Sequence, residues 1–385
     1  MIAIENAHIV LEQGILWDGV LLVEDDLIVA VGSRGDIKIP EGAEKIDAEG
    51  AYVGPGFVDI HVHGGNGHFL YAEPELAAEH FLRHGETTVL ATLYYDLSKQ
   101  EFLEAIERVK HAMKHGKSAK AIGGFYMEGP YMNPKYGACP DKNKWQGPIL
   151  AEDFTEIVEQ AGHHAKVWAV APEREGLELF MQKAREVNSQ VMFSVGHSEA
   201  TPEQIRKLKK YGIGLQTHCM DATGRPECTA GTRSCGPDEA CLQDRNMYAE
   251  VICDSCGIHV QPDMLRMIQH VKGVERMVLI TDSFVSEEES PEHLRHIEDL
   301  VFDSNALLNG SKLTMDIACR NMMSHTNCGI AQVFLMASGN PARVIGMEQE
   351  IGSIEAGKKA NLVFVDHMFH VKKVIFEGKI LEPDV

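Results

Sequence analysis

Hydrophobic and polar residues alternate along both ends of the chain. The alternating stretches, broken by Gly and Asp at turns, are residues 3–10, 19–33, 43–56 and 360–381. Alternation of this kind is typical of half-buried strands. Because the two ends share this character, we predict that residues 1–55 and 346–385 together form one small β-sandwich domain, with the rest of the chain inserted between them.

The middle of the chain, residues 56–345, alternates short apolar runs with helical patterns. Eight of these runs are predicted strands, namely residues 57–64, 87–93, 121–129, 166–173, 190–198, 214–222, 247–254 and 276–283. One of the helical patterns opens with Thr201 as an N-cap and Pro202 at the first helical position. Eight strand–helix units predict a (β/α)₈ or TIM barrel, and a doubly wound parallel sheet is the alternative for the same alternation.

Composition and charge limit the location and the partners. The chain has no apolar run long enough to span a bilayer and no basic start followed by an apolar core, so we expect a cytoplasmic protein. An odd count of nine cysteines in a chain of 385 residues indicates free thiols in a reducing compartment. A formal net charge of −21 disfavours nucleic acid and anionic membranes as partners, but it leaves room for an anionic small molecule.

Six ionisable residues fall at the carboxyl ends of the predicted strands. They are His61 and His63 of the first strand, Glu128 of the third, His197 of the fifth, His218 of the sixth and Asp282 of the eighth. In a barrel these ends converge on one face, where active sites are built. His61 and His63 are two residues apart, so both point to the same side of their strand. Taken singly, each residue could be structural; their shared position predicts a metal site.

Imidazole nitrogens and carboxylate oxygens suit a borderline divalent metal ion. We expect one or two ions, with zinc first and iron, manganese or cobalt as alternatives. A bound metal ion activates water and polarises a carbonyl group. Asp282 on the last strand would take the proton from that water and pass it to a leaving amine. The pattern therefore predicts metal-dependent hydrolysis of an amide.

Several strings of residues carry a family resemblance. The string PGFVDIHVHG at residues 55–64 resembles the first metal motif of the amidohydrolase superfamily. Other strings resemble the N-acetylglucosamine-6-phosphate deacetylases, namely residues 125–138, 194–201, 257–260, 280–283 and 340–366. The resemblance covers nearly the whole chain and implies an amino-sugar substrate and a homodimer.

The resemblance also implies residue roles. Glu128, His197 and His218 would hold the principal metal ion, and His61 and His63 would hold a second ion with Glu128 as the bridge. Asp282 matches the catalytic acid and base of the family. His259 matches a histidine that contacts the sugar, and Arg233 lies near the place of an arginine that reaches across a dimer interface to bind phosphate.

Three departures from the family affect the expected substrate site. After His218 the chain reads Cys-Met-Asp-Ala, so Asp221, followed by Ala222, stands where the family has an asparagine that helps to hold phosphate. A carboxylate there would repel a phosphate group. Cys139 stands at or near the place of a histidine that helps to polarise the carbonyl, and the stretch after Asp282 is unusually acidic. The metal residues are thus intact, whereas the expected substrate contacts are altered.

The leading hypothesis is a deacetylase of N-acetylglucosamine 6-phosphate. Related hypotheses are a deacetylase of N-acetylgalactosamine 6-phosphate or of an unphosphorylated N-acyl compound, and an enzyme that opens a cyclic amide. Glu128, at a position where a carbamylated lysine would favour ring opening, favours the deacetylases. An inactive sugar-binding barrel is the alternative outside enzymes, and Asp282 argues against it. The CDSC motif at 253–256 and the cysteines of the loop 228–241 are either free thiols or, less simply, redox or zinc sites.

Overall fold

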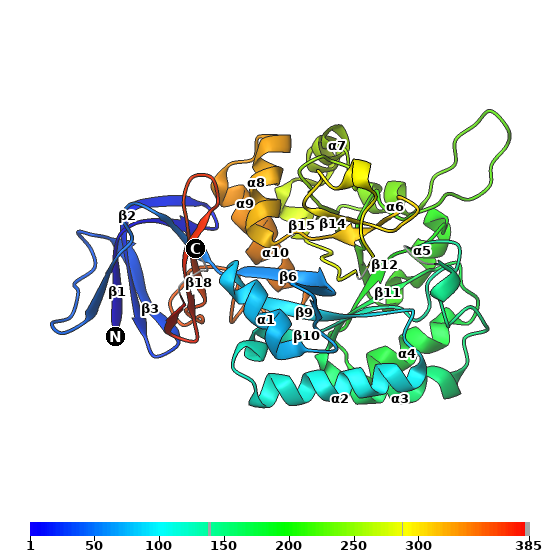
Figure 1. Cartoon of the computed structure of the whole chain (residues 1–385), viewed down its shortest axis with the longest axis horizontal. Coiled ribbons are helices and arrows are strands. Elements are labelled where there is room, and N and C mark those ends of the chain that lie inside the picture. Colours follow the sequence, from blue (N-terminus) through cyan, green and yellow to red (C-terminus); the bar gives the residue numbers. More distant parts are fainter. Residues whose placement is uncertain (138–139, 287, 382–385) are drawn as a thin grey trace.

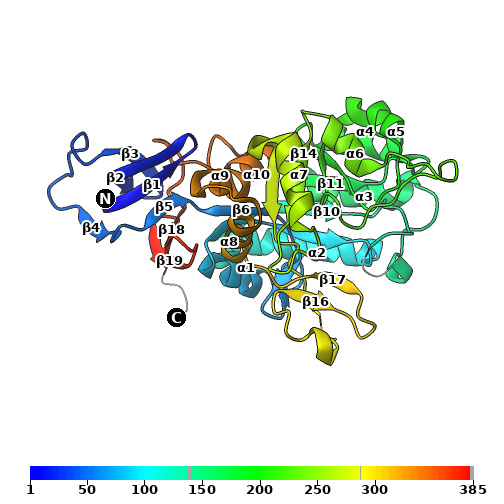
Figure 2. The ribbon, with the colours of Figure 1, turned by 90° about the horizontal axis from the view of Figure 1, so that it is seen from above.

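The computed structural model describes residues 1–137, 140–286 and 288–381. The two terminal segments share one mixed sheet of eight strands, in the order β20-β19-β18-β5-β1-β2-β3 with β4 beside β1. Its strands are β1 (Ile2–Leu11), β2 (Gly14–Glu24), β3 (Leu27–Ser33), β4 (Glu44–Asp47), β5 (Tyr52–Pro55), β18 (Leu362–Val365), β19 (Val371–Phe376) and β20 (Lys379–Leu381). The first and last strands of the chain lie together at one end of the molecule (Figures 1 and 2).

The middle of the chain forms a parallel sheet of eight strands in the order β15-β14-β13-β12-β11-β10-β9-β6. These strands are β6 (Phe57–Val62), β9 (Glu86–Tyr94), β10 (Ile122–Glu128), β11 (Ala165–Val170), β12 (Met192–Val195), β13 (Ile213–Gln216), β14 (Tyr248–Ile252) and β15 (Met277–Ile280). Each corresponds to one of the predicted strands. The last strand returns to the first, because Asp282 N donates a hydrogen bond to His61 O over 3.0 Å and His63 N donates to Ser283 O over 2.9 Å. The barrel prediction is confirmed.

Helices cover the outside of this barrel. Eight of them follow the eight strands in turn, namely α1 (Pro74–Arg83), α2 (Lys99–His115), α3 (Ala151–Ala161), α4 (Leu177–Val187), α5 (Pro202–Leu208), α6 (Pro237–Gln243), α7 (Pro262–Lys272) and α8 (Met315–Thr326). The predicted cap of α5 is present, since the Thr201 hydroxyl accepts a hydrogen bond from Gln204 N. In the described part of the chain, each helix is too short or too polar to cross a membrane.

The sheet of the terminal segments joins the barrel through a short connection and a shared cluster of rings. β5 ends at Pro55 and β6 begins at Phe57, so one strand leads directly into the other. Phe57 packs against Phe334 of α9 (Ile330–Phe334) with ring centroids 5.5 Å apart, and Phe369 packs on both rings from the C-terminal segment. α10 (Asn340–Val344) then returns the chain to the terminal sheet. The division at residues 55 and 346 stays a prediction.

A hairpin that the sequence pattern did not predict lies beside the barrel mouth. It consists of β16 (Leu300–Phe302) and β17 (Leu308–Ser311), inserted between β15 and α8. Figure 2 shows the hairpin below the barrel. Phe284 N donates a hydrogen bond to Ser311 O over 2.9 Å, which ties the hairpin to the segment that follows β15. A second, shorter pair, β7 (Gly64–Gly65) and β8 (His68–Phe69), follows β6.

Candidate metal centre and active site

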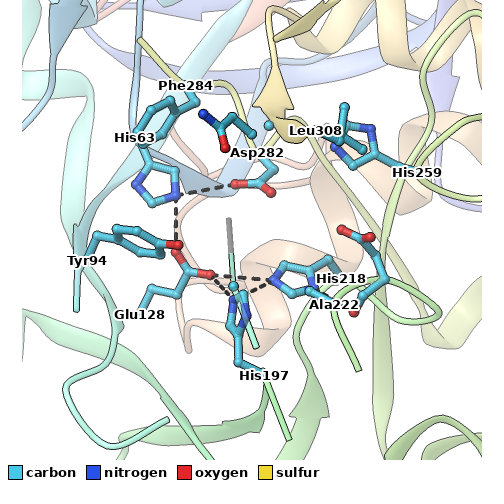
Figure 3. A pocket seen from close by; sticks show the side chains of 14 residues that line it. His63, Tyr94, Glu128, His197, His218, Ala222, His259, Asp282, Phe284 and Leu308 are labelled. Atoms are coloured by element: carbon cyan, nitrogen blue, oxygen red, sulfur yellow. Dashed lines mark hydrogen bonds and ion pairs between the residues drawn. The ribbon is translucent and has the colours of Figure 1, made fainter. Parts of the chain in front are cut away.

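Glu128 is the centre of a buried cluster of imidazoles. It ends β10 and is 2% exposed. One carboxyl oxygen, Oε1, lies 2.7 Å from His197 Nε2 and 3.4 Å from His218 Nε2. The other, Oε2, lies 3.1 Å from His63 Nε2 and 3.5 Å from His61 Nε2. Each oxygen therefore faces its own pair of histidines, as Figure 3 shows for three of the four.

The geometry divides the cluster into two groups that share Glu128. His61, His63 and Glu128 form one group, and Glu128, His197 and His218 form the other, with ligand atoms within 4.8 Å of one another in each. His61 Nε2 and Glu128 Oε2 are buried without a hydrogen bond to any described residue. Unpaired buried atoms of this kind are costly unless a further group satisfies them. Nitrogen and oxygen donors at these distances fit a divalent metal ion.

Asp282 lies on the open side of the cluster. Its Oδ1 is 3.3 Å from His63 Nε2 and 3.7 Å from His61 Nε2. It follows β15, opposite Glu128 in Figure 3, and it lines the pocket above the cluster. The five expected metal residues and Asp282 are thus brought together at the carboxyl ends of five different strands.

Backbone strain accompanies the side chains that enter the cluster. His197, His218 and Asp282 have φ values of 44°, 26° and 48°, in the left-handed region that non-glycine residues rarely adopt. Each lies two residues beyond the end of its strand. Strain of this kind costs about 1–3 kcal/mol per residue and clusters at functional sites. Here the left-handed residue turns the chain at the strand end, where the side chain enters the barrel mouth.

The charges of the cluster depend on one another. Burial alone would raise the pKa of Glu128, but His61, together with hydrogen bonds from His197 and His218, holds it well below its usual range. Burial alone would lower the pKa of His61, but Glu128 and Asp282 outweigh burial and raise it well above its usual value. In the metal-free protein, the His61 imidazole between the carboxylates of Glu128 and Asp282 therefore favours its protonated form. A divalent cation would take the place of this proton.

A pocket opens above the cluster. Beyond the cluster residues its lining consists of Tyr94, Gly137, Asp221, Ala222, His259, Phe284 and residues 308–310 of the hairpin. Asp254 positions His259, because its Oδ2 accepts a hydrogen bond from His259 N over 2.9 Å and lies 3.4 Å from His259 Nδ1. Asp221 contributes to the raised pKa values of His218 and His259, for which burial is the largest, opposing influence. Three of the expected substrate residues, His259, Asp221 and Ala222, therefore face the pocket.

Of the other two expected substrate residues, one lies away from this pocket and one lies outside the described residues. Arg233 lies on the long loop between β13 and α6, which extends away from the barrel in Figure 1. Its side chain is 68% exposed and pairs with Glu239 over 3.1 Å. Cys139 lies outside the described residues. The eight described cysteines, including Cys253 and Cys256 of the CDSC motif, are free thiols.

The sequence patterns missed several residues of the site. Tyr94 ends β9 and lines the pocket, and the hairpin supplies Leu308 and Asn309. Glu250 of β14 is fully buried beside His61. A signal for Glu250 was present, since a carboxyl group within an apolar strand needs a partner. The hairpin gave no such signal, because its residues are brought to the pocket only by the folded chain.

Comparisons with known proteins identify relatives that match nearly the whole chain. A family model described as "Amidohydrolase family" matches residues 52–381. The N-acetylgalactosamine-6-phosphate deacetylase of Escherichia coli O157:H7 is 30% identical over 386 residues, with 96% of each chain covered. The N-acetylglucosamine-6-phosphate deacetylase of Bacillus subtilis (strain 168) is 26% identical, with 98% of this chain and 96% of the relative covered.

A solved structure is similar over the same length. It is a mutant of the N-acetyl-D-glucosamine-6-phosphate deacetylase of Mycobacterium smegmatis in complex with N-acetyl-D-glucosamine-6-phosphate. The TM-score is 0.81 at 26% identity, with 98% of both chains covered. The likeness includes the barrel and the terminal sheet together.

The shared position of Glu128 generates a prediction about metal content. Glu128→Ala should remove metal from both groups, whereas His63→Ala should remove it from one group only, because Glu128 alone belongs to both. Elemental analysis of protein never exposed to chelator measures this, with His8→Ala in the terminal sheet as a control that keeps its metal. Equal metal losses in Glu128→Ala and His63→Ala would contradict the two-group arrangement.

The protonation of the cluster generates a prediction about pH. Burial alone would lower the pKa of His218, but the hydrogen bond to Glu128 and the nearby Asp221 and Asp282 raise it to about 9. His218 therefore carries a proton below that pH in the metal-free protein, and only the neutral imidazole binds metal. Apparent metal affinity should rise as the pH approaches about 9. Calorimetric titrations at several pH values, in buffers of different ionisation enthalpy, should also detect proton release; an affinity independent of pH would contradict the prediction.

Proposed function

The chain belongs to the amidohydrolase family, among the N-acetylhexosamine-6-phosphate deacetylases, and from that premise we propose that it hydrolyses N-acetylglucosamine 6-phosphate to glucosamine 6-phosphate and acetate. The observation that carries the proposal is Glu128 between two pairs of imidazoles, with Asp282 on the open side of the same cluster. N-acetylgalactosamine 6-phosphate is the second candidate substrate, because the relative at 30% identity carries that name.

The histidines around Glu128 would hold the divalent ion in this proposal. We assign zinc as the metal, in one or two ions held by the two groups that share Glu128. A divalent ion, when bound, lowers the pKa of water and polarises the amide carbonyl. The surrounding residues fix the donor atoms in place before metal arrives, since the cluster is buried and anchored at strand ends.

Asp282 moves the proton in the reaction. Its Oδ1 faces the space between the cluster and the pocket, where it would take a proton from the attacking water. The water oxygen then bonds to the carbonyl carbon. Asp282 returns the proton to the amide nitrogen as the carbon–nitrogen bond breaks, and this releases acetate and the free amine. Burial alone would raise the pKa of Asp282, but neighbouring His61 and His63 hold it low, so the carboxyl group is ionised.

The sugar and its phosphate need contacts beyond the cluster. We assign His259, Asp221 and Ala222 to the sugar. The described lining of the pocket contains no lysine or arginine. A phosphate group therefore needs a cation from elsewhere, and we assign Arg233 of a neighbouring copy in a homodimer. The exposed loop that carries Arg233 supports this assignment, as does its guanidinium group, whose one contact among the described residues is with Glu239. A cytoplasmic location belongs to the same proposal.

A screen for acetate release tests the substrate. Purified metal-loaded protein is incubated with N-acetylglucosamine and N-acetylgalactosamine, each with and without a 6-phosphate, and acetate is measured. The proposal expects the highest kcat/KM with N-acetylglucosamine 6-phosphate. A higher value with the galactose isomer would select the second candidate, whereas metal-loaded protein that releases no acetate from any of the four would favour an inactive sugar-binding barrel.

The role of Asp282 predicts the behaviour of Asp282→Asn. The amide cannot accept the proton of the attacking water, so kcat should fall by about 10²–10⁴-fold, the usual contribution of general acid–base catalysis. Metal content should change little, because both metal groups are complete without Asp282. Steady-state kinetics and elemental analysis check the two parts. Activity within threefold of the unaltered protein would remove Asp282 from the mechanism.

The role of Arg233 predicts a loss that depends on phosphate. Arg233→Ala should weaken binding of the phosphorylated substrate by roughly 1.5–3 kcal/mol, the scale of a hydrogen bond to a charged group. Binding of the unphosphorylated sugar should not change. Arg225→Ala is the matched control, because Arg225 pairs with the same Glu239 oxygen over 3.2 Å. Competition kinetics with both sugars measure the difference. Equal losses with both sugars would mean that Arg233 is structural.

Mixed dimers test whether the arginine acts between subunits. Subunits with Arg233→Ala and subunits with Asp282→Asn are each impaired alone. In a heterodimer, one site combines the intact Asp282 of the first subunit with the intact Arg233 of the second. Activity that reappears on mixing supports the assignment, and activity that stays at the level of the separate variants contradicts it.

A further inference from the structure

Glu250 is a buried carboxyl group beneath the metal cluster. It lies on β14, and it is fully buried inside the barrel. One of its oxygens, Oε2, lies 3.2 Å from His61 Nδ1 and 3.2 Å from His218 N. The same oxygen accepts a hydrogen bond from the Tyr126 hydroxyl over 3.3 Å. Glu250 therefore touches one histidine from each metal group.

The contact with His61 determines which ring nitrogen faces the metal position. When Nδ1 carries the proton and donates it to Glu250, Nε2 keeps a free lone pair. Nε2 is the atom that faces Glu128 Oε2, at 3.5 Å. A hydrogen bond at the far ring nitrogen fixes both the tautomer and the ring orientation of a metal-binding histidine. The Tyr126 ring also stacks on the His61 ring, with ring centroids 4.1 Å apart.

A purely structural role for Glu250 is the competing explanation, and Glu86 shows what that role involves. Glu86 is also a fully buried carboxyl group on a barrel strand, at the start of β9. It accepts a hydrogen bond from Met315 N over 2.6 Å, and it makes no contact with a histidine in the described part of the chain. Glu250 differs because its partners belong to the cluster itself.

We propose that Glu250 is the positioning residue for His61, and that it controls whether the metal position formed by His61, His63 and Glu128 is filled. The contact with His218 is to the backbone, so it does not set the tautomer of that ring; His218 Nδ1 faces Asp221 O instead, at 3.2 Å. Loss of Glu250 should therefore affect the two groups unequally. The inference rests on the proposed metal centre, but not on the identity of the sugar.

Titration with cobalt(II) tests the inference without an activity assay. Metal-free protein is titrated and the absorption spectrum recorded, and His63→Ala identifies the step that belongs to the group of His61. In Glu250→Leu this step should weaken by about 10–100-fold, the usual effect of losing an outer hydrogen-bond partner, while the other step stays within about threefold. In Glu250→Gln the loss of cobalt affinity at this step should be smaller than in Glu250→Leu, because the amide oxygen can still accept a hydrogen bond from His61.

Two controls separate positioning from folding. Glu86→Gln alters a buried carboxyl group away from the cluster and should leave both cobalt steps unchanged. Tyr126→Phe keeps the ring that stacks on His61 and removes only the hydroxyl that donates to Glu250. The loss of cobalt affinity at the His61 step should therefore be smaller than in Glu250→Leu. Equal weakening of both steps in Glu250→Leu, no weakening of either, or a single cobalt step in the unaltered protein would each overturn the proposal. Two cobalt steps without acetate release would count against the proposed reaction alone.

Discussion

The shared carboxyl group of Glu128 is the constraint on which the rest of the site depends. A buried carboxylate is strongly unfavourable unless positive charge or hydrogen bonds compensate it. Four imidazoles, two at each oxygen, surround Glu128. Protons can supply part of the compensation, but His61 Nε2 and Glu128 Oε2, 3.5 Å apart, still lack a hydrogen bond to described residues. A divalent cation satisfies this arrangement better than protons do.

The barrel makes such a dense cluster possible because each polar group enters from a different strand. The chain closes the barrel at the height of the cluster, where Asp282 N bonds to His61 O. That single closure places the proton-accepting carboxylate beside the two histidines of the first strand. The left-handed residues at the strand ends add strain, and the regular sheet below them, with its apolar packing, compensates for it.

The substrate side of the pocket differs from the metal side in the charges that it offers to a ligand. The metal side is rich in donors and nearly complete within one chain, whereas the described lining above it offers Asp221 and no lysine or arginine. In a chain with a formal net charge of −21, an anionic ligand needs a local cation. Under the proposed function, substrate choice therefore depends on assembly, because Arg233, the proposed phosphate contact, lies on a loop that extends away from its own barrel.

The sequence by itself determined the barrel, its eight strands and the position of the metal residues, because the period of a strand and the convergence of parallel strand ends place such residues on one face. The tertiary structure decided which residues contact one another in the site. The family resemblance already implied that Glu128 joins two groups of histidines, but the sequence did not indicate which oxygen of Glu128 faces which pair, that Glu250 lies against His61, or that the hairpin at 300–311 lines the pocket. These contacts join residues far apart in the chain, and local periodicity carries no information about which of them meet.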